Sequence, residues 1–216
     1  MTDVFLVRHG ETLWHDENRY AGQSDVELSH RGREQAQALA TWAAEAELDA
    51  LWCSGLRRSR ETAMPCAEAS GLEVKADSRL DEIGFGQAEG LTSQEMRRRF
   101  PRELDAFHAD PIEHPLPGGE DPRVATARGI ACLAEITEEF PLGRVLVVTH
   151  NSLIRLMLCQ LLGIPLAEYR SRFPSIRNCA VNEIHFLAGN HAVLRRFNAP
   201  LIEQHALGQE VADCTR

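Results

Sequence analysis

The chain has 216 residues, of which 44% are hydrophobic and 25% are charged, and its net charge is −9 at pH 7. This composition is typical of a globular protein with a sizeable core, and the acidic balance argues against a nucleic-acid-binding protein, which needs a basic face. No apolar run is long enough to span a membrane. With no linker visible, we expect one domain over residues 1–202 and a tail over 203–216.

The cysteines indicate a reducing compartment. There are six, none belongs to a C-x-x-C pair, and most lie among apolar neighbours, as small buried hydrophobic residues do. The chain enters its first expected strand almost at once, with no signal peptide visible. We therefore expect a cytoplasmic protein without disulfides.

Strand and helix patterns alternate along the chain. In chain order they predict a strand over 3–8, a loop over 13–28, a helix over 29–47, a strand over 49–54, a helix over 56–71, a strand over 72–76, a short helix within 91–101, a helix over 121–140, a strand over 144–150, a helix over 151–163 and two strands within 178–198. Thr92 and Glu95 form a capping box, and Pro101 is expected to interrupt the helical pattern after it. Asp121 before Pro122 is a strong helix start.

This alternation predicts an α/β fold with three layers, in which a mostly parallel sheet carries helices on both faces. The strand over 144–150 is apolar throughout, so we place it in the centre of the sheet, covered on both sides. The last two strands are separated by a tight-turn signal at Gly189 and Asn190, which predicts a C-terminal antiparallel hairpin.

Two buried strands end in similar residues. "VFLVRHG" ends in Arg8 and His9, and "VLVVTHN" ends in His150. Ligands of open α/β sheets bind beyond the carboxyl ends of the strands, so both histidines are expected in one pocket. A single histidine at a strand end is more often a structural residue. Two at matching positions, one preceded by arginine, favour a site for an anion.

Two further segments carry candidate residues. In "CSGLRRSRETA", Arg58 lies at the start of a helix, where a guanidinium and the helix N-terminus together favour anions; Arg57 and Arg60 are better explained as a solvated helix face. In "RLDEIGFGQAEG", Glu82 precedes an apolar residue and closely spaced glycines. Such a loop can hold a carboxyl group against apolar surface, which favours the protonated form that a general acid needs. Alone, this segment would be interpreted as a loop with an exposed glutamate.

Together these segments resemble the histidine phosphatase superfamily, which has the phosphoglycerate mutase-like fold. "LVRHGET", "SGLRRSRETA", "RLDEIGFGQAEG", "LPGGE" and "VVTHNSLIR" occur in the order and spacing of that family, from Val4 to about Phe197. The resemblance implies that His9 takes up the phosphoryl group. It further implies that Arg8, Arg58 and His150 hold the phosphate oxygens. Glu82 would protonate the leaving oxygen and then deprotonate the attacking water.

The resemblance also implies a set of substrate-binding residues, namely Arg8, Thr12, His15, Gly22, Arg58, His150 and Asn151. Two positions depart from the family pattern. The first motif of the family usually continues to Trp-Asn, whereas here Trp14 is followed by His15. The last motif usually reads His-Gly-Gly, whereas here Asn151 and Ser152 follow the histidine. Both departures touch the substrate pocket, so the sequence does not identify the substrate.

The resulting expectation is a phosphomonoester hydrolase that acts on small phosphorylated metabolites and releases inorganic phosphate. No metal and no cofactor is expected, because cationic side chains can neutralise the transferring phosphoryl group. The sequence predicts no nucleic-acid or membrane partner and leaves a homodimer open.

Three alternatives remain open from the sequence. One is a phosphoglycerate mutase, which moves a phosphoryl group between the hydroxyls of a phosphorylated hydroxy acid. Mutases of the family generally carry a longer insertion after the glutamate motif than the segment 91–120, which we expect to set substrate specificity. The other two are a non-catalytic phospho-ligand sensor and a regulator that acts on phosphoproteins. The basic run from Arg97 to Arg99 is expected to be a solvated helix face.

Overall fold

The computed structural model describes residues 1–187 and 191–201. A six-stranded sheet with the order β3-β2-β4-β1-β5-β6 forms its centre. The strands are β1 (Thr2–Arg8), β2 (Ala50–Cys53), β3 (Val74–Ala76), β4 (Arg144–Thr149), β5 (Val181–Phe186) and β6 (Ala192–Ala199). The pairs among β1 to β4 are parallel, whereas β5 pairs antiparallel with both β1 and β6. The predicted mostly parallel sheet and its antiparallel hairpin are confirmed.

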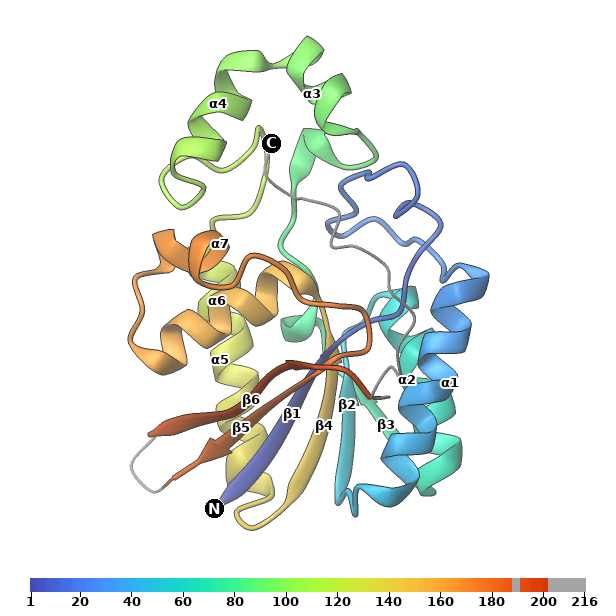
Figure 1. Cartoon of the computed structure of the whole chain (residues 1–216). Coiled ribbons are helices and arrows are strands. Elements are labelled where there is room, and N and C mark those ends of the chain that lie inside the picture. Colours follow the sequence, from blue (N-terminus) through green and yellow to red (C-terminus); the bar gives the residue numbers. More distant parts are fainter. Residues whose placement is uncertain (188–190, 202–216) are drawn as a thin grey trace.

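Helices cover both faces of the sheet, as predicted. The α-helices are α1 (His30–Glu45), α2 (Arg57–Ser70), α3 (Ser93–Arg99), α4 (Pro101–Ala109), α5 (Pro122–Glu139), α6 (Asn151–Leu162) and α7 (Tyr169–Arg172). Short 3₁₀ turns lie at Ser78–Leu80, Gly86–Ala88 and Leu166–Glu168. Figure 1 shows α1 and α2 on one side of the sheet and α5 and α6 on the other, with α3 and α4 beyond one end of the strands.

The alternation of side chains along the strands explains these layers. In β1, Val4 and Leu6 face a core shared with α5 and α6, whereas Phe5 and Val7 face a core shared with α1 and α2. The central strand β4 is buried on both sides, as its continuous apolar run predicted. The sheet is thereby a rigid support whose carboxyl ends point toward α3 and α4 (Figure 1).

Capping residues place several helix ends where the sequence predicted them. The capping box of Thr92 and Glu95 is present, and Asp121 caps α5 ahead of Pro122. The interpretation of Pro101 as an interruption was incomplete, because Pro101 is the first residue of a new helix, α4. Proline is tolerated there since the first N–H groups of a helix have no intrahelical acceptor.

Parts of the expected outline lie outside the described residues. These are the predicted turn at Gly189 and Asn190, the tail over 203–216 and Cys214. The single-domain boundary at residue 202 therefore stays a prediction. The other five cysteines are buried and free. No helix in the described part of the chain is long and apolar enough to cross a membrane.

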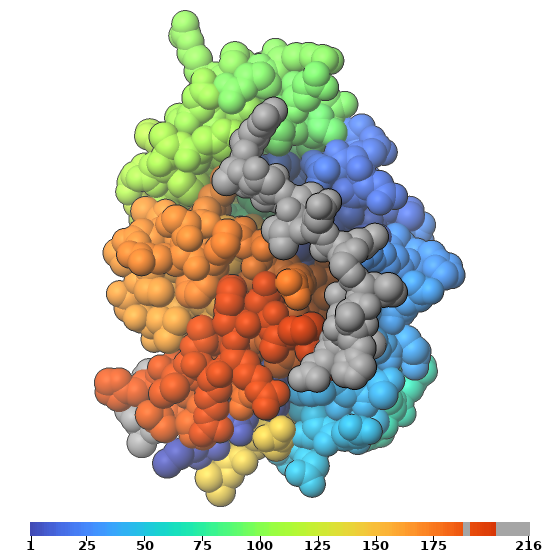
Figure 2. Space-filling model, in the orientation of Figure 1, coloured from blue at the N-terminus to red at the C-terminus, as the bar shows by residue number. Residues whose placement is uncertain are grey.

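The segment 91–120 has a small hydrophobic cluster of its own. The buried members of this cluster are Ala88, Met96, Phe100, Leu104, Phe107 and Leu116. They pack on one another and on Tyr20, Phe85 and Leu91, and Phe85 also packs against the core beside α5 and α6, to which Ile112 of the segment belongs. Figure 2 shows this segment gathered at one end of the molecule. The side chains from Arg97 to Arg99 are exposed, as expected of a solvated helix face.

Candidate active site

The structure brings His9 and His150 together at the tips of two neighbouring strands. Arg8 at the end of β1 pairs in register with Thr149 at the end of β4. The N–H of His9 donates to the carbonyl oxygen of Thr149 at 3.0 Å, and the ring centroids of His9 and His150 lie 5.1 Å apart. The pocket inferred from matching strand ends is therefore present in the fold.

Hydrogen bonds fix the tautomer of His9. Its Nδ1 lies 2.6 Å from the carbonyl oxygen of Gly10, which can only accept, so Nδ1 carries the proton. Nε2 then has the free lone pair and accepts from Nε of Arg58 at 3.2 Å. Burial, followed by the charges of Arg58 and Arg8, holds the pKa of His9 well below its ordinary value. The ring is thus neutral near pH 7, with a nucleophilic nitrogen directed at a guanidinium.

Arg58 is held in the first turn of α2 by backbone carbonyls. It is 1% exposed and donates to the carbonyl oxygens of Gly22 at 2.6 Å and Ser24 at 2.8 Å. Gly22 has φ +49°, and a Cβ built there would lie 2.2 Å from Oε1 of Glu89. Glycine is therefore needed for the loop to bring its carbonyl to Arg58.

Arg8 is half-buried and also lacks a carboxylate partner among the described residues. Nη1 donates to the carbonyl oxygen of Ile176 at 2.8 Å, Nη2 lies 2.7 Å from Nε2 of His15, and Nε has no partner. Burial is the main reason that the pKa of Arg8 is lowered to about 10. The group is still a cation near pH 7, so its charge is available to an anion.

His15, one of the two departures from the family pattern, lies beside these cations and lines the same cavity. The backbone N–H of Thr12 donates to Nδ1 of His15 at 3.0 Å. A neutral ring must then carry its proton on Nε2, where it faces the donor group of Arg8. Burial, followed by the charge of Arg8, lowers the pKa of His15 to about 4. The two donors oppose each other, and an anion between them would accept from both.

Glu82 is held by backbone donors. Its carboxylate accepts from the N–H groups of Ile83, Ser152 and Leu153, each at 3.0 Å. The last two belong to the first turn of α6, so Glu82 lies at the positive end of a helix. This differs from the expected apolar surroundings, since the loop places the carboxylate on N–H donors. The side chain is 6% exposed and lines the cavity.

These groups surround a cavity of about 690 Å³. Of the residues proposed from the sequence, those that line it are Arg8, His9, Thr12, His15, Gly22, Arg58, Glu82 and Asn151. His150 does not line it. Its ring is fully buried, with Nε2 2.7 Å from Oγ of Ser54 and Nδ1 without a partner among the described residues. The structure thus assembles nearly all of the proposed site in one place.

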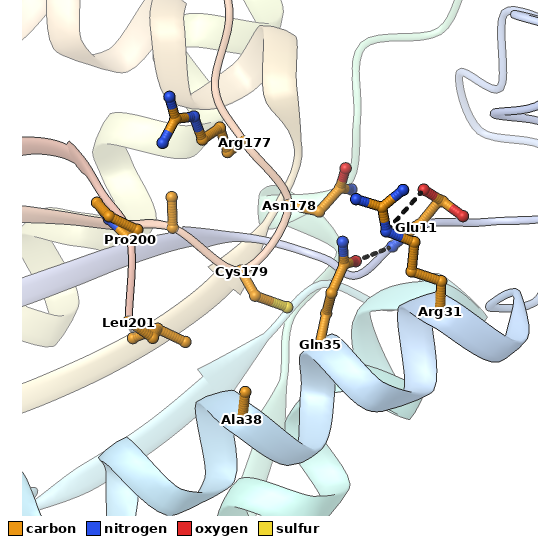
Figure 3. Close-up of a pocket in the computed structure, with 10 residues that line it drawn as sticks. Glu11, Arg31, Gln35, Ala38, Arg177, Asn178, Cys179, Pro200 and Leu201 are labelled. Atoms are coloured by element: carbon orange, nitrogen blue, oxygen red, sulfur yellow. Dashed lines mark hydrogen bonds and ion pairs between the residues drawn. The ribbon is translucent and has the colours of Figure 1, made fainter. Parts of the chain in front are cut away.

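A second cavity, of about 470 Å³, lies between α1, which contributes Arg31, Gln35 and Ala38, and the chain at 177–180 and 200–201 (Figure 3). Asn178 on its wall donates from Nδ2 to the carbonyl oxygen of His9 at 2.7 Å. Gln35, also on the wall, accepts from the N–H of Glu11 at 2.8 Å. These bonds hold the backbone on both sides of Gly10. None of the residues proposed from the sequence lines this cavity.

Comparison with known proteins identifies the family. The model of the histidine phosphatase superfamily, branch 1, matches residues 4–199. The chain belongs to this superfamily. The predicted family and fold are confirmed.

Relatives within the superfamily include phosphatases and mutases. The chain is 32% identical to phosphoserine phosphatase 1 of Hydrogenobacter thermophilus, over 90% of this chain and 92% of the relative. It is 36% identical to the probable phosphoglycerate mutase GpmB of Escherichia coli, over 86% of each chain. The solved structure of mycobacterial glucosyl-3-phosphoglycerate phosphatase with VO₃ aligns with a TM-score of 0.85 and 28% identity, over 92% of this chain and 99% of the other.

Several residues of the cavity were not predicted from the sequence. Its wall also includes Trp14, Asn18, Arg19, Tyr20, Ala21, Phe85, Ser93, Phe107, Ser152, Arg155, Tyr169 and Arg170. A signal existed for Arg155, which is the one charged residue within the apolar helical run "NSLIRLMLCQLLG". For the aromatic residues no local pattern separates a pocket wall from a core.

No group of three or more His, Cys, Asp or Glu side chains in the described part of the chain is placed to hold a metal ion. The arrangement that is present consists of a neutral imidazole, two buried or half-buried guanidiniums, a second imidazole and a carboxylate on a helix N-terminus. Such a set can bind a tetrahedral anion, accept its central atom on nitrogen and move a proton.

Proposed function

We propose that the protein is a phosphomonoesterase that transfers the phosphoryl group of a small phosphorylated metabolite to Nε2 of His9. The observation that carries this proposal is the state of His9, a neutral imidazole whose proton is held on Nδ1 by Gly10 and whose free nitrogen faces Arg58. Phosphatases among the relatives support the same reaction type.

The proposed reaction has two steps, formation of a phosphohistidine and its hydrolysis. Nε2 of His9 forms a bond to phosphorus while the bond to the ester oxygen breaks, and Glu82 gives that oxygen a proton. Water then attacks the phosphohistidine and passes a proton to Glu82, which releases inorganic phosphate and restores His9. In both steps Arg8 and Arg58 hold the equatorial oxygens. His150 does not line the cavity, so its proposed contact with the phosphoryl group depends on Nδ1, the ring nitrogen that has no partner among the described residues. The N–H groups of Ile83, Ser152 and Leu153 orient the carboxyl group of Glu82 for these proton transfers.

We propose that this reaction needs no metal, because the guanidiniums of Arg8 and Arg58 bring two positive charges to the site of the phosphate dianion. The segment 91–120 is proposed to set substrate choice, since it contributes Ser93 and Phe107 to the cavity wall.

A phosphoglycerate mutase is the second candidate, favoured by the relatives named as probable mutases. A mutase must retain its phosphohistidine, whereas a phosphatase must admit water. A panel of phosphorylated metabolites, scored for both released phosphate and isomerised product, separates the two. Isomerisation faster than phosphate release would establish the mutase.

The phosphohistidine is the most direct test. Quenching during turnover of 4-nitrophenyl phosphate should give an acid-labile adduct of one phosphoryl group by intact mass, and His9→Ala should lose both adduct and turnover. We expect vanadate to inhibit as a mimic of the transferring group, and dialysis against a chelator to leave the rate unchanged. An exposed histidine, His30, provides the matched control His30→Ala.

Substantial turnover by His9→Ala would exclude His9 as the nucleophile. A wild-type protein that binds phosphate but turns over no ester would instead support the phospho-ligand sensor. Hydrolysis of phosphopeptides in preference to all metabolites would support the phosphoprotein-directed regulator.

A further inference from the structure

One cation in the active-site cavity has no task in the proposed reaction. Arg155 lies on α6, one helical turn after Asn151, and both residues line the cavity. Arg155 is 6% exposed, its Nε has no partner, and its guanidinium makes one long contact, of 3.4 Å, from Nη2 to the carbonyl oxygen of Arg170. Within residues 1–187 and 191–201 it forms no ion pair.

Arg128 shows what a purely structural arginine looks like in the same protein. Its guanidinium binds the carboxylate of Glu120 through Nε at 2.8 Å and Nη2 at 2.9 Å. It also donates to the backbone carbonyl oxygens of Arg79, Asp81 and Glu82. Both nitrogens of its fork and its Nε are satisfied. Arg155 is more deeply buried and has almost none of these contacts.

Burying an unpaired guanidinium costs folding free energy, so its presence in a cavity wall needs a compensating partner. The ring of Tyr169, whose centroid lies 5.0 Å from Cζ of Arg155, supplies a cation–π contact but no acceptor oxygen. Glu82 is not that partner, because its carboxylate is already bound to three backbone N–H groups. Among the described residues only the carbonyl oxygen of Arg170 accepts from this guanidinium, which leaves it available to an acceptor on a ligand in the cavity.

The phosphate is already provided with cations. Arg8 and Arg58 flank His9 and balance the two charges of a phosphate dianion. Arg155 lies three residues beyond Ser152, whose N–H binds Glu82, so it is about 4.5 Å further along the axis of α6. Arg170 also lines this part of the cavity, with its guanidinium 5.2 Å from the ring centroid of Phe107. The positive charge thus extends beyond Glu82, toward the position of the leaving group.

We propose that Arg155, assisted by Arg170, is a subsite for a second anionic group, a carboxylate or a second phosphate, carried by the leaving group of the substrate. The inference rests on the proposed phosphatase function and narrows its substrate class. Asn151, on the same face of α6, adds an amide group to this wall of the cavity.

Matched esters test the subsite. Propyl phosphate is compared with 3-phosphooxypropanoate, in which a carboxylate replaces the terminal methyl group, and with 1,3-propanediol bisphosphate, which carries a second phosphate. Butyl phosphate and 4-phosphooxybutanoate repeat the comparison at one carbon more. We expect kcat/KM of the wild-type protein to be at least about tenfold higher for an ester with a second anion than for the alkyl ester of equal length.

Substitutions of Arg155 test whether this residue causes the preference for esters with a second anion. Arg155→Met should bring the ratio of the two kcat/KM values close to one, and Arg155→Lys should leave an intermediate ratio, because lysine keeps the charge but not the planar fork. Arg102 is exposed on α4 and does not line the cavity, so Arg102→Met, which removes the same charge, should keep the wild-type ratio. A larger increase in kcat/KM for the esters with a carboxylate indicates a carboxylate subsite. A larger increase for the bisphosphate indicates a phosphate subsite.

Two results would overturn the subsite. One is a wild-type ratio near one for every matched set, which decides the matter even if Arg155→Met fails to fold. The other is a preference that Arg155→Met leaves unchanged. Hydrolysis of 4-nitrophenyl phosphate by the same preparation shows whether the phosphatase function itself stands. If that ester is not hydrolysed, the proposed function fails, and calorimetric binding of the same ester pairs to the wild-type protein decides the subsite.

Discussion

Two groups of buried polar residues lie close together in this protein and differ in how completely they are paired. The strand-tip cluster comprises Arg8, His9, Arg58 and His150. The Arg128 clamp comprises Arg128, Glu120 and the backbone carbonyl oxygens that accept from Arg128. In the clamp, the guanidinium of Arg128 forms an ion pair with Glu120, and its remaining N–H groups donate to backbone carbonyl oxygens. In the cluster, Nε of Arg8 and Nδ1 of His150 have no partner, and neither arginine binds a carboxylate of the described chain.

This difference separates residues that hold the fold from residues that bind. A saturated arginine stabilises the loop that carries Glu82, because three of its bonds end on backbone carbonyls there. Arg8 and Arg58 bind no carboxylate of the described chain, so their charges remain available for an anionic ligand. The two groups should therefore respond in opposite ways to substitution, in activity for the cluster and in stability for the clamp.

The largest effect is expected at Glu82, whose side chain lines the cavity and whose backbone carbonyl is bound by Arg128. Glu82→Gln should lower turnover of an alkyl phosphate by roughly 10²- to 10⁴-fold, the range of a lost general acid. On 4-nitrophenyl phosphate, phosphorylation of His9 should slow much less, because that leaving group hardly needs a proton. Single-turnover rates on both esters measure this. An equal loss on both would show that Glu82 is not the acid.

The comparison of Arg58 with Arg128 is the next test. Arg58→Met should lower kcat/KM by about 10²- to 10³-fold through the lost stabilisation of the phosphoryl oxygens. Arg128→Met should instead reduce the free energy of unfolding by about 2–4 kcal/mol, because it removes the cation bound to the half-buried carboxylate of Glu120 and a donor to each of three backbone carbonyls. Urea unfolding and steady-state kinetics on both variants decide this.

Arg60→Met is the control for the Arg58 variant, because Arg60 is exposed two residues further along the same helix. Should Arg128→Met prove as stable as the wild type, the assignment of the clamp as a structural device would be wrong.

The histidines of the site should make stability fall in mild acid. Burial is the main cause that lowers the pKa of His9, His150 and His15 in the folded protein, to about 4 for His15. The unfolded chain binds protons near pH 6.5, so the folded state binds fewer protons below that pH and loses stability as the pH falls toward the folded pKa values. Each histidine contributes up to about 1.4 kcal/mol per pH unit.

Urea unfolding at intervals from pH 7.5 to 5 measures how steeply the free energy of unfolding falls as the pH falls. His9→Asn should reduce this slope, whereas His30→Asn should not, because His30 is exposed on α1. Equal slopes in the wild type and His9→Asn would remove His9 from the acid sensitivity of the fold.

The smallest effect concerns His15. In the free protein the pKa of about 4 keeps this ring neutral from pH 5 to 8. A bound phosphate dianion favours the cation, so binding takes up a proton wherever the pKa in the complex exceeds the solution pH. Affinity then falls as the pH rises, by at most tenfold per unit.

The inhibition constant of inorganic phosphate, measured across this pH range and corrected for the ionisation of phosphate itself, gives the change in affinity with pH. His15→Asn should reduce this change, because an amide takes up no proton. A slope that persists unchanged in His15→Asn would show that His15 does not sense the bound phosphate.

The sequence predicted the parts of the fold that depend on local patterns. The continuous apolar run of β4, the capping box at Thr92 and the Asp121–Pro122 helix start all lie where expected, because each is determined by neighbouring residues. His9 and His150 could be paired from the sequence since parallel strands end at the same edge of a sheet.

The features that the sequence could not predict depend on contacts between distant segments. The N–H donors that surround Glu82 belong partly to α6, about 70 residues away. The opposing donors at His15 and the unpaired guanidinium of Arg155 are likewise properties of assembled surroundings. The helix that begins at Pro101 was missed because proline both ends α3 and starts α4.

The small hydrophobic cluster of the segment 91–120 has a consequence for how the protein can change. Its apolar side chains, such as Met96 and Leu104, pack on one another, while the reacting groups are carried by β1, β4 and α2. Glu120 of the segment belongs to the Arg128 clamp and Ile112 to the core beside α5 and α6. We therefore expect α3 and α4, which carry most of the small cluster, to be the part that can be exchanged with a relative without rebuilding the strands that hold His9 and His150. If the segment sets substrate choice as proposed, grafting α3 and α4 between family members should change that choice and leave the chemistry in place.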